Sequence, residues 1–181
     1  MSGRGSNLKA IIDANDPLIE IRAVISNRPD AKGLIYAQEN GIPTEVLDHK
    51  QFATRQSFDT HLQTSIDHYQ PKLIVLAGFM RILSSEFVAH YQGRLINIHP
   101  SLLPAFKGLN THQQALEAGV KEHGASVHFV TEDLDAGPVI IQASVPVLPD
   151  DDSESLGARV LIEEHRIYPQ AIHWFAEKHL F

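Results

Sequence analysis

Two polar residues at the end of one apolar run have side chains suited to acyl-transfer chemistry. Asn97 and His99 belong to the run Leu95–His99, and Pro100 follows it. Residues two apart in a β-strand point to the same side, so the carboxamide and the imidazole are predicted to be neighbours. Both can donate a hydrogen bond to one oxygen, as an oxyanion forming in acyl transfer requires. The alternative is that both side chains only satisfy backbone groups at a strand end.

A turn with the sequence DLDAGP supplies two carboxylates, Asp133 and Asp135. Aspartates in turns commonly accept hydrogen bonds from their own backbone. The functional interpretation is that one of them approaches His99 and favours the charged form of its imidazole. The residues alone leave both interpretations open.

A glycine-rich segment near the beginning of the sequence is suited to binding an anion. Gly3, Arg4, Gly5, Ser6 and Asn7 precede a helix-like run of apolar positions. Glycines let the backbone approach a ligand closely, and the N–H groups at a helix start favour negative charge. The spacing matches neither the P-loop nor the dinucleotide fingerprint. The alternative is a flexible glycine-rich terminus.

Two further features have weaker chemical signals. The segment Gly78–Leu83 follows the most apolar run and is suited to lining a flat apolar pocket, although ordinary core at the start of the next helix is the favoured interpretation. The eleven histidines form no compact metal-binding pattern, so no metal is expected. His128 lies in a predicted strand and is a candidate to face the same site as His99.

The elements that must position these residues alternate between strands and helices. Apolar runs rich in β-branched residues predict five strands, at 21–26, 73–78, 95–99, 126–130 and 139–147. Helices are predicted after the glycine-rich loop and at 31–40, 57–69, 84–91, 111–118 and from Ser153 onward, with Pro169 kinking or dividing the last. This alternation predicts an α/β fold, a Rossmann-like, mostly parallel sheet flanked by helices.

Two details refine this fold. The last two predicted strands are joined by a short loop, which favours an antiparallel pair. The strand expected before the glycine-rich loop is absent from the sequence as it stands, so the loop needs either an earlier start or another support. In such sheets ligands bind beyond the carboxyl ends of the strands, where the candidate residues lie.

Composition limits the class of protein. The 181 residues predict a single domain, 1–181, and the net charge of −7 without a basic cluster disfavours nucleic acid as a partner. There is no apolar run long enough for a membrane span, no secretory signal pattern and no cysteine. A cytoplasmic protein that binds neither membranes nor nucleic acid is therefore expected.

Five segments together resemble a known family. They are SGRGSNL at 2–8, LAGFMRIL at 76–83, NIHPSLLPAFKG at 97–108, THQQAL at 111–116, and SVHFV with LDAGPVI at 126–140. The chain resembles the folate-dependent formyltransferases, and within them the branch that acts on glycinamide ribonucleotide in purine synthesis. The resemblance covers nearly the whole chain, but the family's first strand is missing and the sequence stops earlier than in some members.

The resemblance implies roles for individual residues. Asn97, His99 and Asp135 match the family's catalytic trio. Contacts to glycinamide ribonucleotide are implied for Gly5, Ser6, Asn7 and Glu164. Contacts to the folate are implied for Arg55, Met80, Arg81, Ile82, Leu83, Asn97, Thr131, Glu132, Asp133, Leu134 and Asp135.

The implied reaction moves the formyl group of 10-formyltetrahydrofolate, the co-substrate, to the glycyl amine of glycinamide ribonucleotide. Both expected partners are small molecules, and the chain is expected to be a monomer or a homodimer. One alternative is a 10-formyltetrahydrofolate hydrolase, in which water replaces the amine. Another is a folate- or nucleotide-binding relic without turnover.

Overall fold

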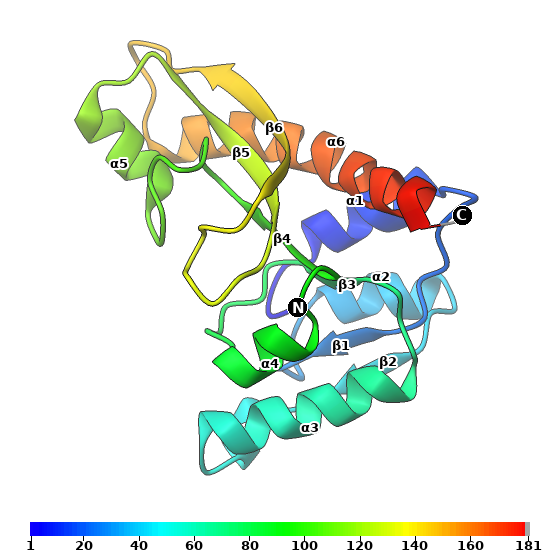
Figure 1. The fold of residues 1–181 in the computed structure, drawn as a ribbon. Helices are drawn as coiled ribbons and strands as arrows, with labels where there is room; N and C mark the ends of the chain where they lie inside the picture. The colour runs from blue at the N-terminus through cyan, green and yellow to red at the C-terminus, as the bar shows by residue number, and fades with distance from the viewer. Residues whose placement is uncertain (180–181) are drawn as a thin grey trace. The chain divides into compact units, whose positions relative to one another are not determined.

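The computed structural model describes residues 1–179 and divides them into two compact units. The first unit is Met1–Leu95, and the second begins at Ile96. Both combine strands with helices, which confirms the predicted α/β class (Figure 1).

The first unit contains a small parallel sheet. Strand β1 (Val24–Ser26) pairs in parallel with β2 (Thr44–Val46), and helix α2 (Gly33–Glu39) connects them. The sequence did not predict β2, because three residues are too short to establish an alternation. The other elements of this unit are α1 (Ser6–Ala14), the 3₁₀-helix η1 (His49–Gln51), α3 (Arg55–His68), β3 (Ile74–Leu76) and α4 (Ser85–His90).

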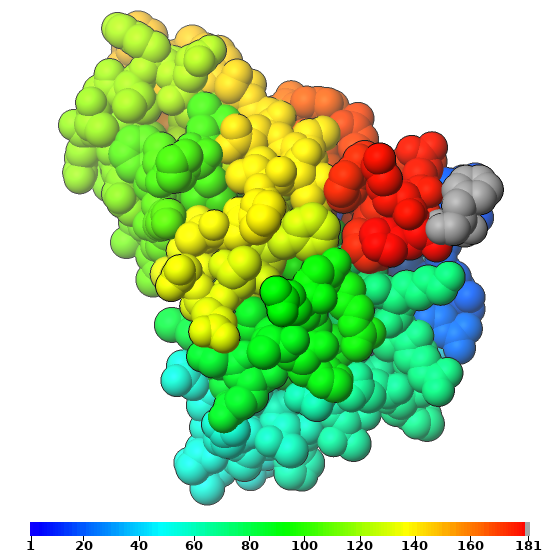
Figure 2. All heavy atoms as spheres, in the orientation of Figure 1, coloured from blue at the N-terminus to red at the C-terminus, as the bar shows by residue number. Residues whose placement is uncertain are grey.

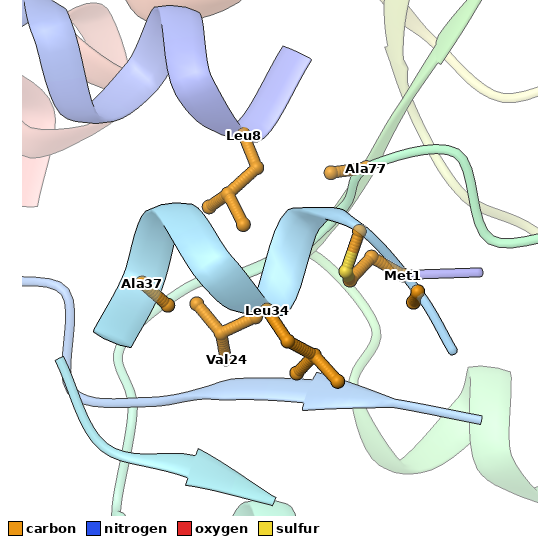
Figure 3. Close-up of a cluster of buried hydrophobic side chains, with 7 residues drawn as sticks. Met1, Leu8, Val24, Leu34, Ala37 and Ala77 are labelled. Atoms are coloured by element: carbon orange, nitrogen blue, oxygen red, sulfur yellow. The ribbon is translucent and has the colours of Figure 1, made fainter. Parts of the chain in front are cut away.

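A cluster of buried apolar side chains holds these elements together (Figure 3). Leu8 of α1 and Leu34 of α2 pack with Val24 of β1, and Ala77 adds the end of the segment after β3. Met1 also belongs to this cluster, which places the first residues of the chain inside the core. Burial of such side chains contributes about 1.5–3 kcal/mol each for the larger ones.

Backbone hydrogen bonds of Met1 and Ser2 support the glycine-rich loop. Asn27 N donates to Met1 O at 3.3 Å, and Ser2 N donates to Gly78 O at 3.1 Å. These residues are not assigned to a strand, but they bond on one side to the end of β1 and on the other to the segment after β3. The loop therefore has the second of the two predicted supports.

The second unit is an antiparallel sheet backed by a long helix. Strand β4 (Leu95–His99) pairs antiparallel with β5 (Glu122–Phe129), which pairs antiparallel with β6 (Val139–Pro146). The predicted antiparallel pairing of the last two strands is confirmed. Helix α5 (Thr111–Ala118) lies between β4 and β5 in the sequence.

Helix α6 (Ser153–His179) contacts both β5 and β6 (Figure 1). Its buried side chains include Leu156, Val160, Ile167 and Phe175, which recur at intervals of three, four or seven and eight residues and so form one apolar face. The helix runs as one element through Pro169, so the proline does not divide it. Of the helices described, up to residue 179, none is both long and apolar enough to cross a membrane.

Candidate active site

Strand β4 brings Asn97 and His99 to one side of the antiparallel sheet of the second unit. Asn97 is paired across the sheet with His128, and His99 with Ser126. His99 is only 5% exposed. The sequence prediction that the carboxamide and imidazole are neighbours follows from this register, and the register adds His128 beside them.

Asp135 lies against the imidazole of His99. Its Oδ2 is 3.4 Å from His99 Nδ1, and both side chains are less than a tenth exposed. Gly108 N donates to the same carboxylate oxygen at 3.0 Å. Asp135 has a φ of 49°, in the left-handed region that aspartate tolerates better than most residues. Of the two aspartates that the sequence offered, Asp135 is the one that reaches His99.

The second ring nitrogen of His99 also has an acceptor. His99 Nε2 lies 2.9 Å from the carbonyl oxygen of Phe106. A carbonyl can only accept, so Nε2 carries a proton. With Asp135 facing Nδ1, both nitrogens meet acceptors, and this environment suits the imidazolium form.

His128 has the opposite environment. Its Nδ1 lies 3.0 Å from Phe129 O and therefore donates, which leaves Nε2 to accept. Asn97 Nδ2 is 3.5 Å from that nitrogen. Burial lowers the pKa of His128, so the ring stays neutral near pH 7 and can orient the Asn97 carboxamide. Asp135 Oδ1 lies 3.8 Å away on the same side.

Buried polar groups anchor the segment that carries the Phe106 carbonyl. Ser126 Oγ donates to Ser101 O at 2.6 Å and accepts from Leu103 N at 3.0 Å. Gln142 Nε2 donates to Leu103 O and to Ser126 Oγ, both at 2.8 Å. Sequence reasoning missed Phe106, Ser126 and Gln142, since backbone carbonyls and cross-strand side chains leave no spacing signal.

The segment between β5 and β6, yellow in Figure 2, lies at the surface of the second unit. Thr131, Glu132, Asp133 and Leu134 are exposed there, and Leu134 is 59% exposed. Gly137 closes the segment, because a Cβ on it would lie 1.8 Å from Phe129 O. The segment thus presents side chains to solvent while its end is fixed against β5.

A small cavity adjoins this segment. Its volume is about 210 Å³, and the lining residues are Leu103, Pro104, Lys107, Asp135, Ala136, Gly137 and Val139. The Asp135 carboxylate is its acidic member. The cavity therefore offers space for part of a small molecule next to the His99–Asp135 pair.

In the first unit, the glycine-rich loop leads directly into α1. Gly5 has a φ of 73°, and a Cβ on it would lie 2.3 Å from the Cα of Gly33. Only glycine meets both conditions without strain. Ser6 and Asn7 form the first turn of α1, where backbone N–H groups favour an anion. This is the geometry that the sequence predicted.

The segment after β3 is not ordinary core. Met80 is 73% exposed and Ile82 is 65% exposed, so the favoured core interpretation of Gly78–Leu83 is wrong. Arg81 lies between them, with its guanidinium 4.9 Å from the ring centroid of Phe58. Arg55 is exposed at the start of α3. Exposed apolar side chains on an anchored backbone suit a flat aromatic ligand.

Glu164 lies on α6 in the second unit and is only 8% exposed. Its charge and the burial of Tyr168 raise the pKa of that phenol well above its usual value, with burial the larger cause. Among residues 1–179 there is no group of three histidine, cysteine or acidic side chains that could hold a metal ion.

Comparison with known proteins adds a second line of evidence. A family model described as formyl transferase matches residues 1–172. Phosphoribosylglycinamide formyltransferase of Escherichia coli is 56% identical over 99% of this chain and 86% of its own length. The human trifunctional purine biosynthetic protein adenosine-3 is 47% identical over 95% of this chain and 17% of its own length.

Solved structures agree. The phosphoribosylglycinamide formyltransferase of Coxiella burnetii has a TM-score of 0.94 and 59% identity, over 98% of this chain and 85% of that one. The glycinamide ribonucleotide transformylase 1 of Symbiobacterium toebii has a TM-score of 0.95 and 46% identity, over 100% of this chain and 87% of that one. The chain belongs to the formyl transferase family.

Proposed function

We propose that the chain transfers the formyl group of 10-formyltetrahydrofolate to the glycyl amine of glycinamide ribonucleotide, a step of purine biosynthesis. The relatives carry the names of this activity, and the observation that supports it in the chain itself is the Asn97–His99–Asp135 arrangement. The substrates are small molecules, and 10-formyltetrahydrofolate is the co-substrate.

The amine attacks the formyl carbon directly, so a C–N bond forms and the formyl oxygen gains negative charge. Asn97 Nδ2 has a second N–H besides the one that faces His128, and it donates to this oxyanion. The His99 imidazolium donates the Nε2 proton, which the Phe106 carbonyl holds in the structure. A developing oxyanion is a stronger acceptor than a neutral carbonyl and replaces it.

Asp135 stabilises the positive charge of His99 and fixes the ring through Nδ1. The intermediate collapses by breaking the bond from carbon to N10 of the folate. N10 gains a proton as the attacking amine loses one, and a water beside Asp135 relays the proton between them. The chain needs no nucleophile of its own for this sequence of bonds.

The substrate contacts belong to the same proposal. Gly5, Ser6 and Asn7 bind the ribonucleotide phosphate at the start of α1, and Glu164 contacts the same substrate. The folate contacts Arg55, Asn97, the segment 80–83 and the segment 131–135. The supporting observations are the helix start, the exposed apolar side chains at 80 and 82, and the exposed segment beside the cavity. A single domain over 1–181, a monomer or homodimer, and a cytoplasmic location stay predictions.

The test is formyl transfer with purified protein and 10-formyltetrahydrofolate, with and without glycinamide ribonucleotide. Tetrahydrofolate that forms only when the ribonucleotide is present, together with formylated ribonucleotide, is the expected result. Equal tetrahydrofolate formation without the ribonucleotide would instead establish hydrolysis. Binding of both ligands without any product would contradict catalysis altogether.

A further inference from the structure

The hydroxyl of Ser2 joins the two segments of the first unit to which substrate contacts are assigned. Ser2 is 4% exposed. Its Oγ accepts a hydrogen bond from Met80 N at 3.0 Å, and its own N donates to Gly78 O at 3.1 Å. The segment that presents Met80 and Ile82 is therefore held at its beginning by the residue that begins the glycine-rich loop.

A buried carboxamide sets the direction of the hydroxyl. Ser2 Oγ lies 2.6 Å from Asn27 Oδ1 and donates to it. Asn27 is also 4% exposed, and its Nδ2 lies 3.2 Å from His49 Nδ1, which orients the amide. With its proton committed to Asn27, the hydroxyl has lone pairs left for the Met80 N–H. A hydroxyl is needed here because one group must both donate and accept.

The other end of the loop is equally constrained. Gly33 N donates to Gly3 O at 3.3 Å, and the backbones of Gly5 and Gly33 touch. The stretch from Ser2 to the start of α1 therefore has no slack between its anchor on Met80 and its anchor on α2. A shift of one segment must be passed to the other or break a buried hydrogen bond.

We propose that Ser2 is a positioning residue that couples the two substrate sites, so that an anion bound at the start of α1 orders the segment 78–83 for the folate. The inference rests on the proposed function for the identity of the two ligands. Ordering by the first ligand lowers the conformational cost of binding the second. Such coupling is reciprocal, so the folate must strengthen ribonucleotide binding by the same factor.

The test is calorimetric titration of the full chain with tetrahydrofolate, with and without saturating glycinamide ribonucleotide. Tetrahydrofolate has no formyl group, so no transfer occurs during the titration. In the wild-type chain we expect the ribonucleotide to tighten folate binding roughly three- to tenfold, the range set by one hydrogen-bonded link. Ser2→Ala is expected to bring this ratio close to one, and Ser2→Thr, which keeps a hydroxyl, to restore most of it.

Ser65→Ala is the matched control. The Ser65 hydroxyl donates to Glu45 Oε1 at 2.6 Å in the same unit, so this variant also loses one side-chain hydrogen bond. It should lower stability slightly and leave the binding ratio unchanged. If Ser2→Ala does not fold, Asn27→Ala, which removes the acceptor of the hydroxyl, should lower the same ratio. Intact mass verifies that all variants have the same first residue.

A wild-type ratio of one, or an unchanged ratio in folded Ser2→Ala, would overturn the coupling while formyl transfer by the wild-type chain still stood. An absence of transfer together with an absence of ligand binding would overturn the proposed function itself. The two failures are therefore distinguishable in one set of experiments.

Discussion

The imidazole of His99 has an acceptor on each ring nitrogen, whereas the imidazole of His128, in the same site, is neutral. The difference comes from their partners. His99 faces a carboxylate and a carbonyl, while His128 donates to one carbonyl and is otherwise desolvated. Two histidines of one sheet thus have different protonation states, and each state fits a different task toward the oxyanion and Asn97.

At the residue scale, His99→Ala should lower kcat by about 10²–10³, the usual cost of one oxyanion donor. The KM values should change less, because the lost bond forms only as charge develops on the formyl oxygen. Steady-state kinetics measure both parameters, and circular dichroism verifies the fold. His68→Ala removes an exposed imidazole and serves as the control. Turnover near the wild-type rate in His99→Ala would remove His99 from the mechanism.

At the element scale, the start of α1 depends on backbone geometry rather than on side chains. Gly5 has a positive φ and lies against the backbone of Gly33. Gly41 has a similar φ of 67°, but a Cβ added to it would have no other atom within 4 Å. The two glycines therefore separate the cost of backbone conformation from the cost of a steric clash.

Gly41→Ala should lower the free energy of unfolding by about 1–2 kcal/mol, the cost of a left-handed alanine. Gly5→Ala should cost more than that and should also raise the KM for glycinamide ribonucleotide, because the helix start must move away from Gly33. Urea unfolding and steady-state kinetics test the pair. Equal stability losses with an unchanged KM would show that the close approach of Gly5 and Gly33 has no role in binding.

At the scale of the whole molecule, buried histidines set the response to acid. Burial is the main cause that lowers the pKa of His123 from 6.5 to about 4, and the neighbouring His112 adds to it. The facing ring nitrogens of these two residues are 3.1 Å apart, and His123 Nδ1 has no hydrogen-bond partner among residues 1–179. Burial also lowers the pKa of His112 and of His165.

Between pH 6.5 and about 4 the unfolded chain binds protons that the folded chain does not bind. The free energy of unfolding should therefore decrease as the pH falls through this window, by up to about 1.4 kcal/mol per pH unit for each such proton. His123→Gln should flatten the dependence, while His68→Gln should not. Urea unfolding at a series of pH values measures the slope, and an unchanged slope in His123→Gln would contradict this origin.

Sequence determined the α/β class, most of the strands and helices and the family, because these depend on local periodicity and on motifs such as NIHPSLLP and LDAGP. It also placed Asn97 and His99 side by side, since alternation along one strand fixes their direction.

Tertiary structure decided the features that no spacing encodes. It selected Asp135 over Asp133 as the partner of His99, exposed Met80 and Ile82 where core was favoured, and added β2, which is too short for a pattern. It also supplied the Phe106 carbonyl and the Ser2 hydroxyl as hydrogen-bond partners. The physical reason is that hydrogen bonds and burial between residues distant in sequence depend on how the chain is packed, and backbone groups are identical in every residue type.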